Sequence, residues 1–333
     1  TGKAFQSLNG SFTEPWLGGK RPNALTISVF SSRSFRNFFV ADLNDNQREL
    51  LYITGASVGL GRRLLWPDDN FSIQTSINYQ RYNLQNWRSD FLLTNGQSNN
   101  LSFTTTFARY SLDQPIYPRS GSNISLSVQI TPPFSAIFNS SVDYSLANDS
   151  KKYKWAEYHK WKLKAEWFTS LGGKLVLRTS AKMGAMGYYN PDIGHSPFER
   201  DGIANFNLYG KDIIALRGYE ATEVTRRTTN VGHPFYAKYT VELRYPLSLN
   251  PSSTIYALAF AEGGNSWATF KNFNPFDVNR SAGIGLRVFL PMFGTLGFDY
   301  GVGFDKNLPA DDSVWKYISN RGRFNVVLGL EPE

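Results

Sequence analysis

Residues 160–167 read KWKLKAEW, and charged residues alternate with apolar ones along the whole stretch. In an extended chain, Trp161 and Trp167 fall on one side, whereas three lysines and Glu166 fall on the other. The charged side needs water, and tryptophan suits the boundary between water and lipid. The stretch therefore predicts a β-strand with one face toward water and the other toward a membrane.

The same period of two recurs almost from end to end of the chain, for example in residues 71–80 (FSIQTSINYQ) and 124–131 (ISLSVQIT). Many segments are long enough for a tilted strand to cross a bilayer, whereas strands of a soluble β-sandwich usually have about five or six residues. Aromatic residues also gather at the predicted strand ends, as in the girdles of membrane barrels: Trp66, Tyr79, Tyr82, Tyr110, Tyr117, Tyr188, Tyr189, Tyr245 and Trp267. These features favour a transmembrane antiparallel β-barrel over a soluble sandwich.

Composition agrees with this all-β class. The chain has 333 residues, of which 41% are hydrophobic and 15% aromatic. Its longest apolar run, residues 255–261, is far shorter than the roughly 20 residues of a transmembrane helix. A helical membrane protein is excluded, whereas a barrel is allowed because only every second residue of its strands faces lipid.

Charge and cysteine content exclude further classes. The net charge is +8, but the 35 lysines and arginines form no basic helix or stripe, so no nucleic-acid partner is predicted. The absence of cysteine excludes disulfides and thiolate metal sites, and it suits an oxidising compartment. Residues 1–4 do not begin a signal peptide, which an outer-membrane protein needs, so we expect a mature chain or a fragment.

The predicted connections alternate between short turns and long loops. Short turns are expected at residues 66–69, 171–173 and 291–294, and long polar loops near residues 33–49, 83–98, 132–156, 188–234, 264–280 and 305–322. This alternation is the plan of outer-membrane barrels, with the short turns in the periplasm.

Thirteen strands are predicted, at residues 4–13, 23–33, 49–62, 70–82, 99–110, 121–131, 157–170, 174–187, 235–247, 254–263, 281–290, 295–304 and 323–330. Bacterial single-chain barrels have even numbers of strands. The odd count indicates either an error of one strand or an incomplete barrel.

Several motifs resemble those of one family of outer-membrane barrels. Leu216-Arg217-Gly218-Tyr219, within the long loop 188–234, resembles the Val-Arg-Gly-Phe/Tyr signature of the BamA family of outer-membrane protein assembly barrels. Further segments resemble that family in the same order, and together they cover essentially the whole chain: residues 12–16 (FTEPW), 112–121 (LDQPIYPRSG), 241–246 (VELRYP), 262–267 (EGGNSW) and 280–285 (RSAGIG).

The resemblance implies a barrel of sixteen strands, of which this chain would supply the fourth to the sixteenth. Residues 1–333 would then form one outer-membrane β-barrel domain that lacks the first three strands and the periplasmic POTRA domains. The chain departs from the family at residues 324–333 (FNVVLGLEPE), where the family's barrel usually closes on an aromatic residue.

The resemblance also implies that loop 188–234, on the extracellular side, folds back into the lumen. Arg217 would then pair with carboxylates on the barrel wall, and the family positions correspond to Glu242 and Glu262. Alternation independently predicts that Glu242 points inward, whereas the strand before Glu262 shows no clear sidedness. The alternative for Arg217 is an exposed loop arginine.

The last strand is the second candidate site. By resemblance it would form a lateral gate that pairs poorly with the first strand, and a strand edge with unpaired backbone groups suits templating of another strand. An ordinary closing strand is the alternative. The residues of this gate strand are Arg323, Phe324, Asn325, Val326, Val327, Leu328, Gly329 and Leu330.

The function implied is that of a non-enzymatic insertase in the bacterial outer membrane, which folds client barrels without ATP or a cofactor. Its partners would be unfolded outer-membrane proteins, accessory lipoproteins, and the lipid and lipopolysaccharide of that membrane. His159, His195 and His233 show no metal-ligand spacing, and no Gly-x-Ser-x-Gly elbow occurs, so neither a metal site nor an enzyme is predicted. The alternatives are a sibling translocation, assembly or two-partner secretion barrel, and a passive pore or receptor.

Overall fold

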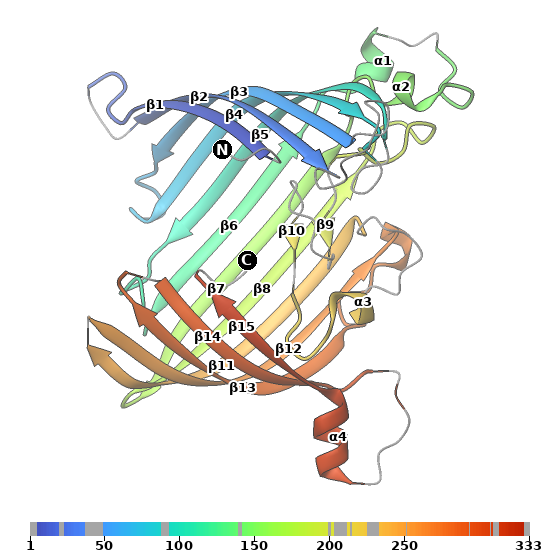
Figure 1. Ribbon diagram of the computed structural model, residues 1–333. Helices are drawn as coiled ribbons and strands as arrows, with labels where there is room; N and C mark the ends of the chain where they lie inside the picture. The colour runs from blue at the N-terminus through green and yellow to red at the C-terminus, as the bar shows by residue number, and fades with distance from the viewer. Residues whose placement is uncertain are drawn as a thin grey trace. The chain divides into compact units, whose positions relative to one another are not determined.

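The structure is a computed structural model. It describes residues 5–19, 23–36, 49–87, 93–138, 142–198, 201–202, 212–213, 215–224, 233–250, 252–292, 294–306, 308 and 313–329. Within these residues, thirteen strands form one sheet in the order of the chain (Figure 1). The fold class is therefore all-β, with an antiparallel meander in which each strand of this sheet lies beside the sheet's next strand along the chain.

The strands of the large sheet are β1 (Phe5–Glu14), β2 (Asn23–Arg36), β3 (Glu49–Arg63), β4 (Phe71–Gln85), β5 (Gly96–Tyr110), β6 (Gly121–Ile130), β7 (His159–Gly172), β8 (Leu175–Gly187), β11 (Phe235–Asn250), β12 (Ser253–Trp267), β13 (Asn279–Leu290), β14 (Gly294–Gly303) and β15 (Gly322–Leu328). Two short strands, β9 (Asp201–Gly202) and β10 (Asp212–Ile213), pair in parallel with each other.

The described helices are short and lie in the connections. They are α1 (Phe134–Phe138), α2 (Asp149–Lys152), α3 (Ala221–Val224), the 3-10 helix η2 (Phe270–Asn272) and α4 (Val314–Arg321). In the described part of the chain, no helix has the length and apolar character required to span a membrane.

The thirteen predicted strands correspond one to one to the strands of the large sheet. The largest boundary difference is in β12, which continues to Trp267 through residues expected to be a loop. It does so because its ladder with β11 extends as far as the pair Phe235 and Trp267. The sequence pattern also missed β9, β10 and the loop helices, since elements of two to eight residues carry too little periodicity to detect.

The chain divides into two compact units, which we describe separately. The first comprises residues 1–108, 126–161 and 186–200. Its buried positions are partly polar: Tyr158 accepts hydrogen bonds at its hydroxyl from Asn100 (3.1 Å) and Gln129 (2.9 Å). Tyr82 stacks on Phe198 with 4.1 Å between the ring centroids.

The second unit comprises residues 109–125, 162–185 and 201–333. Its strand β11 separates the two faces of the sheet clearly: Val241 and Leu243 are exposed on the outer face, whereas Glu242 and Arg244 are buried on the inner face. This is the sidedness that alternation predicts for β11. An apolar face of this kind suits contact with lipid hydrocarbon.

An apolar cluster fills part of the inner face of the second unit. It consists of Tyr117, Phe168, Val176, Tyr256, Leu258 and Phe260. Tyr117 comes from the turn between β5 and β6 and donates a hydrogen bond to the carbonyl of Arg244 (3.2 Å), and burial raises the pKa of Tyr117 to about 12. Because inward residues of β12 belong to this cluster, both faces of that strand are apolar, which explains why its sequence showed no sidedness.

The aromatic residues at the strand ends do not all belong to one outer girdle. Six of the nine are exposed, with exposed fractions from 38% for Tyr79 to 82% for Trp66. Tyr82, Tyr117 and Trp267 are instead buried, with 7%, 2% and 6% exposed. The interpretation of these three as lipid-facing anchors is wrong, because they pack into the interior of their units.

The depth of an outward residue in the membrane should decide the effect of a charge placed there. Leu243 lies near the middle of β11 and Leu249 near its end, and both are exposed. We predict that Leu243→Arg lowers the free energy of unfolding by about 2–4 kcal/mol, whereas Leu249→Arg lowers it by about 0–1 kcal/mol. Urea titration of the whole protein in a bilayer measures both values, and equal losses at the two positions would contradict the assignment of this face to lipid.

Candidate functional site

Residues 215–224 lie against the inner face of the second unit. Leu216 and Tyr219 are buried in a cluster with Val224 and Tyr236. Gly218 has a φ of +88°, and a Cβ atom there would lie 3.0 Å from backbone atoms of β14. Glycine is therefore required twice over, for its left-handed conformation and for the close approach of two backbones.

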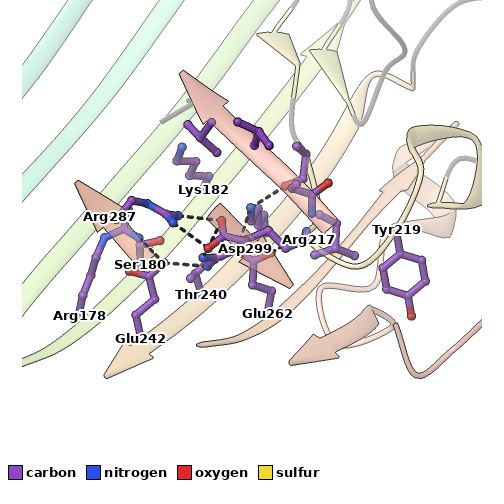
Figure 2. A pocket seen from close by; sticks show the side chains of 16 residues that line it. Arg178, Ser180, Lys182, Arg217, Tyr219, Thr240, Glu242, Glu262, Arg287 and Asp299 are labelled. Atoms are coloured by element: carbon purple, nitrogen blue, oxygen red, sulfur yellow. Dashed lines mark hydrogen bonds and ion pairs between the residues drawn. The ribbon is translucent and has the colours of Figure 1, made fainter. Parts of the chain in front are cut away.

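Arg217 is the centre of the site. Its guanidinium donates to Glu262 from Nε (3.0 Å) and from Nη2 (2.7 Å), and Nη2 also lies 2.7 Å from Glu242. Its backbone N–H donates to Glu262 as well (2.9 Å), and Nη1 lies 3.7 Å from Asp299. The guanidinium stacks 3.6 Å from the ring centroid of Phe260. Figure 2 shows these carboxylates grouped around Arg217.

Further cations surround Glu242, of which only 1% is exposed. Arg244 donates to it from Nε (2.8 Å) and Nη2 (2.6 Å), and Arg178 lies 3.1 Å from its other oxygen. Arg178 in turn donates to Glu166 (2.5 Å). This part of the network therefore links β7, β8 and β11.

The other two carboxylates have their own cations. Lys238 lies 3.1 Å from Glu262, and Arg287 binds Asp299 through two hydrogen bonds of 2.7 and 2.8 Å. Both acids are nearly inaccessible, with 5% and 1% exposed. A buried carboxylate is strongly destabilising without paired cations and hydrogen bonds, so the network as a whole permits these acids to be ionised.

Arg217 itself remains charged. Burial alone would lower its pKa, but the attraction of Glu262 and Glu242 outweighs burial and leaves the pKa above its ordinary value. The loop therefore carries a permanent cation, which pairs with the carboxylates of the sheet.

Tyr219 attaches the same loop to the end of the sheet. Its hydroxyl donates to the carbonyl of Arg280 (2.9 Å) and accepts from the backbone N–H of Asp305 (2.8 Å). Burial raises the pKa of Tyr219 to about 12. Lys306 lies 3.2 Å from Glu223 and so joins the following connection to the same loop.

The last strand lies beside this site. Asn325 of β15 is opposite Asp299 of β14, and Phe324, Val326 and Leu328 are exposed. Arg323 lies 2.8 Å from Glu220, the residue after the Leu-Arg-Gly-Tyr motif. The described part of the gate strand ends at Gly329, and Leu330 lies outside the described residues.

The structure thus brings Arg217, Glu242 and Glu262 together, as the sequence analysis expected of their positions. Sequence reasoning did not assign six further residues to the network: Glu166, Arg178, Lys238, Arg244, Arg287 and Asp299. The sequence does single out Asp299, because it is the one charged residue among the small inward residues of β14 (GTLGFDYGVG). The pairing of arginines with particular acids needed the register between strands.

The site contains charges that hold segments of the chain together. Within the residues that the structure describes, no group of three or more His, Cys, Asp or Glu side chains has the geometry to hold a metal ion. Its chemical capability is therefore to fix the loop to the sheet through charge-assisted hydrogen bonds.

Comparison with known proteins gives the family. A model of the Omp85 superfamily domain matches residues 1–331. Among solved structures, BamA from Haemophilus ducreyi lacking POTRA domains 1–3 is similar, with a TM-score of 0.63 and 18% identity over 91% of this chain and 59% of that chain. CdiB from Escherichia coli is similar with a TM-score of 0.50 and 14% identity, over 96% of this chain and 52% of that one. No curated protein sequence matches the chain.

The described residues form thirteen strands in one sheet, with exposed apolar side chains and, in the second unit, a buried charged inner face. Together with the comparisons, these features define a β-barrel of the bacterial outer membrane. Because the superfamily model matches nearly every residue, the chain belongs to the Omp85 superfamily. It spans between half and two thirds of the length of the two similar structures.

Removal of Arg217 should release the loop while leaving the strands formed. Arg217→Ala deprives two buried acids of a cation, and we predict a loss of about 3–5 kcal/mol of unfolding free energy, with circular dichroism of the strands unchanged. The temperature at which the folded band disappears in heat-modifiable gel mobility of the whole protein measures the loss of stability.

Arg280→Ala is the matched control. Arg280 also binds a carboxylate through two hydrogen bonds, from Nε and Nη2 to Asp305, but 66% of its side chain is exposed, so the variant should stay close to wild type. A wild-type transition for Arg217→Ala, or an equal loss in both variants, would show that the buried network does not hold the loop.

Proposed function

We propose that this protein is an insertase of the BamA type, which folds and inserts client β-barrels into the outer membrane through a lateral gate without ATP. The observation that carries the proposal is the attachment of loop residues 215–224 to the strands that precede the last one, with an ion pair reaching the last strand itself. The protein would act without an enzymatic reaction or cofactor, since insertion is downhill and only its barrier needs to be lowered.

The barrier arises because an unfolded chain must bring polar backbone groups into lipid. A strand edge provides hydrogen-bond partners for these groups while they enter the bilayer. Within the described residues, β15 has one neighbour, β14, and lies at the end of the sheet order. We therefore propose β15 as the strand on which a client forms its first backbone hydrogen bonds.

The last strand is also less firmly held than its neighbours. Seven residue pairs join β15 to β14, whereas ten join β14 to β13 and fifteen join β11 to β12. In the described part of β15, the ion pair between Arg323 and Glu220 is its one charged link to the loop. An exposed pair of this kind contributes about 0–1 kcal/mol, which suits a strand that must open and close.

The partners follow from the same mechanism. Clients would be unfolded outer-membrane proteins delivered from the periplasm, and accessory lipoproteins would assist delivery. We expect the intact barrel to have sixteen strands and periplasmic POTRA domains. Lipid and lipopolysaccharide would contact the exposed apolar face.

A sibling role is the second candidate. The likeness to CdiB covers 96% of this chain and the likeness to BamA 91%, although the TM-score with BamA is higher. A barrel dedicated to secretion of one partner would share the same fold. A reconstituted protein that inserts several unrelated client barrels supports the general insertase, whereas export of a single substrate supports the dedicated secretion barrel.

Tethering the last strand to the loop tests whether β15 moves during insertion. The chain has no cysteine, so Glu220→Cys with Arg323→Cys can be joined specifically by a cleavable bismaleimide. We predict that the joined protein in liposomes inserts clients no better than empty liposomes do, because β15 cannot separate from the loop, and that cleavage of the linker restores insertion.

The control joins two strands elsewhere in the sheet. Thr13 and Thr26, on β1 and β2, have hydroxyl oxygens 3.2 Å apart, and the same linker between cysteines at these positions should leave insertion intact. Undiminished insertion by the Glu220–Arg323 tether, or equal loss in the control, would count against a mobile last strand.

A further inference from the structure

A cavity of about 210 Å³ lies on the inner face of the second unit, beside the Arg217 network (Figure 2). Residues from the loop, from strands in the middle of the unit and from the last strand line it, among them Ser180, Lys182 and Asn325. A volume of this size admits a carboxylate or a phosphate together with water. The cavity is therefore large enough for a small ligand group.

The walls of this cavity carry more positive than negative charge. Five lining side chains are cationic, Arg178, Lys182, Arg217, Lys238 and Arg287, and three are anionic, Glu242, Glu262 and Asp299. Arg244 and Glu166, which bind lining residues from outside the cavity, add one charge of each sign and leave the excess at two. A confined space with this excess attracts an anion.

Of the five cations that line the cavity, four are paired with acids and Lys182 is the exception. Arg217 and Lys238 lie within 3.1 Å of Glu262, Arg178 within 2.5 Å of Glu166, and Arg287 within 2.7 Å of Asp299. Lys182, by contrast, has no hydrogen bond or ion pair with any residue in the described part of the chain, and no dashed line reaches it in Figure 2.

The charges that act on Lys182 are largely repulsive. Lys238, Lys164 and Arg178 repel it, whereas Glu166 attracts it. An ammonium group in such surroundings is stabilised by a ligand anion that accepts its hydrogen bonds. Ser180 and Asn325 line the same cavity and offer a hydroxyl and an amide N–H as further donors.

We infer that this cavity binds an oxyanion, with Lys182 as the principal cation and Ser180 and Asn325 as additional donors. The oxyanion is either a free one, such as inorganic phosphate, or the carboxylate of a polypeptide. Binding as such depends only on the cavity and its charges.

A role of this cavity in binding client proteins rests on the proposed function. Asn325 and Val327 of β15 both line the cavity, so a chain that pairs with β15 would pass beside it. An inward Asp or Glu of that chain would then meet Lys182, and the site would favour client strands that carry an acid at that register.

Thermal unfolding of the whole protein in detergent micelles tests the inference. The probe is inorganic phosphate, titrated at constant ionic strength against chloride, because a ligand that binds the native state raises the unfolding temperature in a concentration-dependent way. We predict saturable stabilisation of the wild type by phosphate, and an apparent Kd about tenfold weaker or more in Lys182→Gln, since one charge-assisted hydrogen bond is lost.

Two variants distinguish specific binding of phosphate in the cavity from a nonspecific effect of the protein's net charge. Lys164→Gln removes the same charge from a lysine that does not line the cavity and should bind phosphate like the wild type. Lys182→Arg keeps the cation and should retain binding. Equal effects of phosphate and chloride, or equal weakening by Lys164→Gln and Lys182→Gln, would overturn the inference.

A second arm distinguishes the two sources of the anion. A client-derived strand peptide with one inward Asp is compared with its Asn counterpart in the same assay. Weaker binding of the Asn peptide to the wild type, and equal binding of both to Lys182→Gln, supports the polypeptide carboxylate. If phosphate binds but the two peptides never differ, the site accepts a free oxyanion and its use by clients is overturned, while the insertase proposal is judged separately by the tether.

Discussion

Three carboxylates buried on one face of a β-sheet are the constraint on which the rest of this structure depends. Glu242, Glu262 and Asp299 are all at most 5% exposed, and ionised acids cannot occupy such positions without cations close by. The sheet supplies several of these cations from neighbouring strands. Arg217, however, comes from a loop, so satisfying the acids of the sheet also determines where the loop lies.

Within the second unit, some strands are joined by the buried ion pairs, whereas the last strand is not. Side-chain charges connect strands β7, β8 and β11 to one another, and Arg217 of the loop links this group to Asp299 of β14. The loop also packs its glycine backbone directly on β14. The last strand contributes no acid or base to the buried network in the described residues, and Arg323 meets Glu220 where both are exposed. A rigid wall next to a lightly attached edge is what templated strand addition requires, because the wall positions the edge while the edge remains free to exchange partners.

Much of the fold could be predicted from the sequence, because a strand between water and lipid must alternate. Residues 160–167 and 71–80 show this directly, and every one of the thirteen strands was located. Strand β12 shows no such alternation, because Tyr256 and Phe260 fill the interior opposite outward alanines and remove the contrast between the two faces. The inward position of Glu262 could therefore be predicted only from the family resemblance. The partners of Arg217 beyond the two family acids depend on cross-strand register, which no single strand encodes.

We infer that Arg217 organises the loop and the last strands rather than the sheet as a whole. Hydrogen–deuterium exchange of the whole protein in micelles, wild type against Arg217→Ala, measures this residue by residue. We predict faster amide exchange in residues 215–224 and in β14 and β15, with β2 and β3 unchanged. Unchanged exchange in β15, or an equal acceleration in β2 and β3, would contradict the claim.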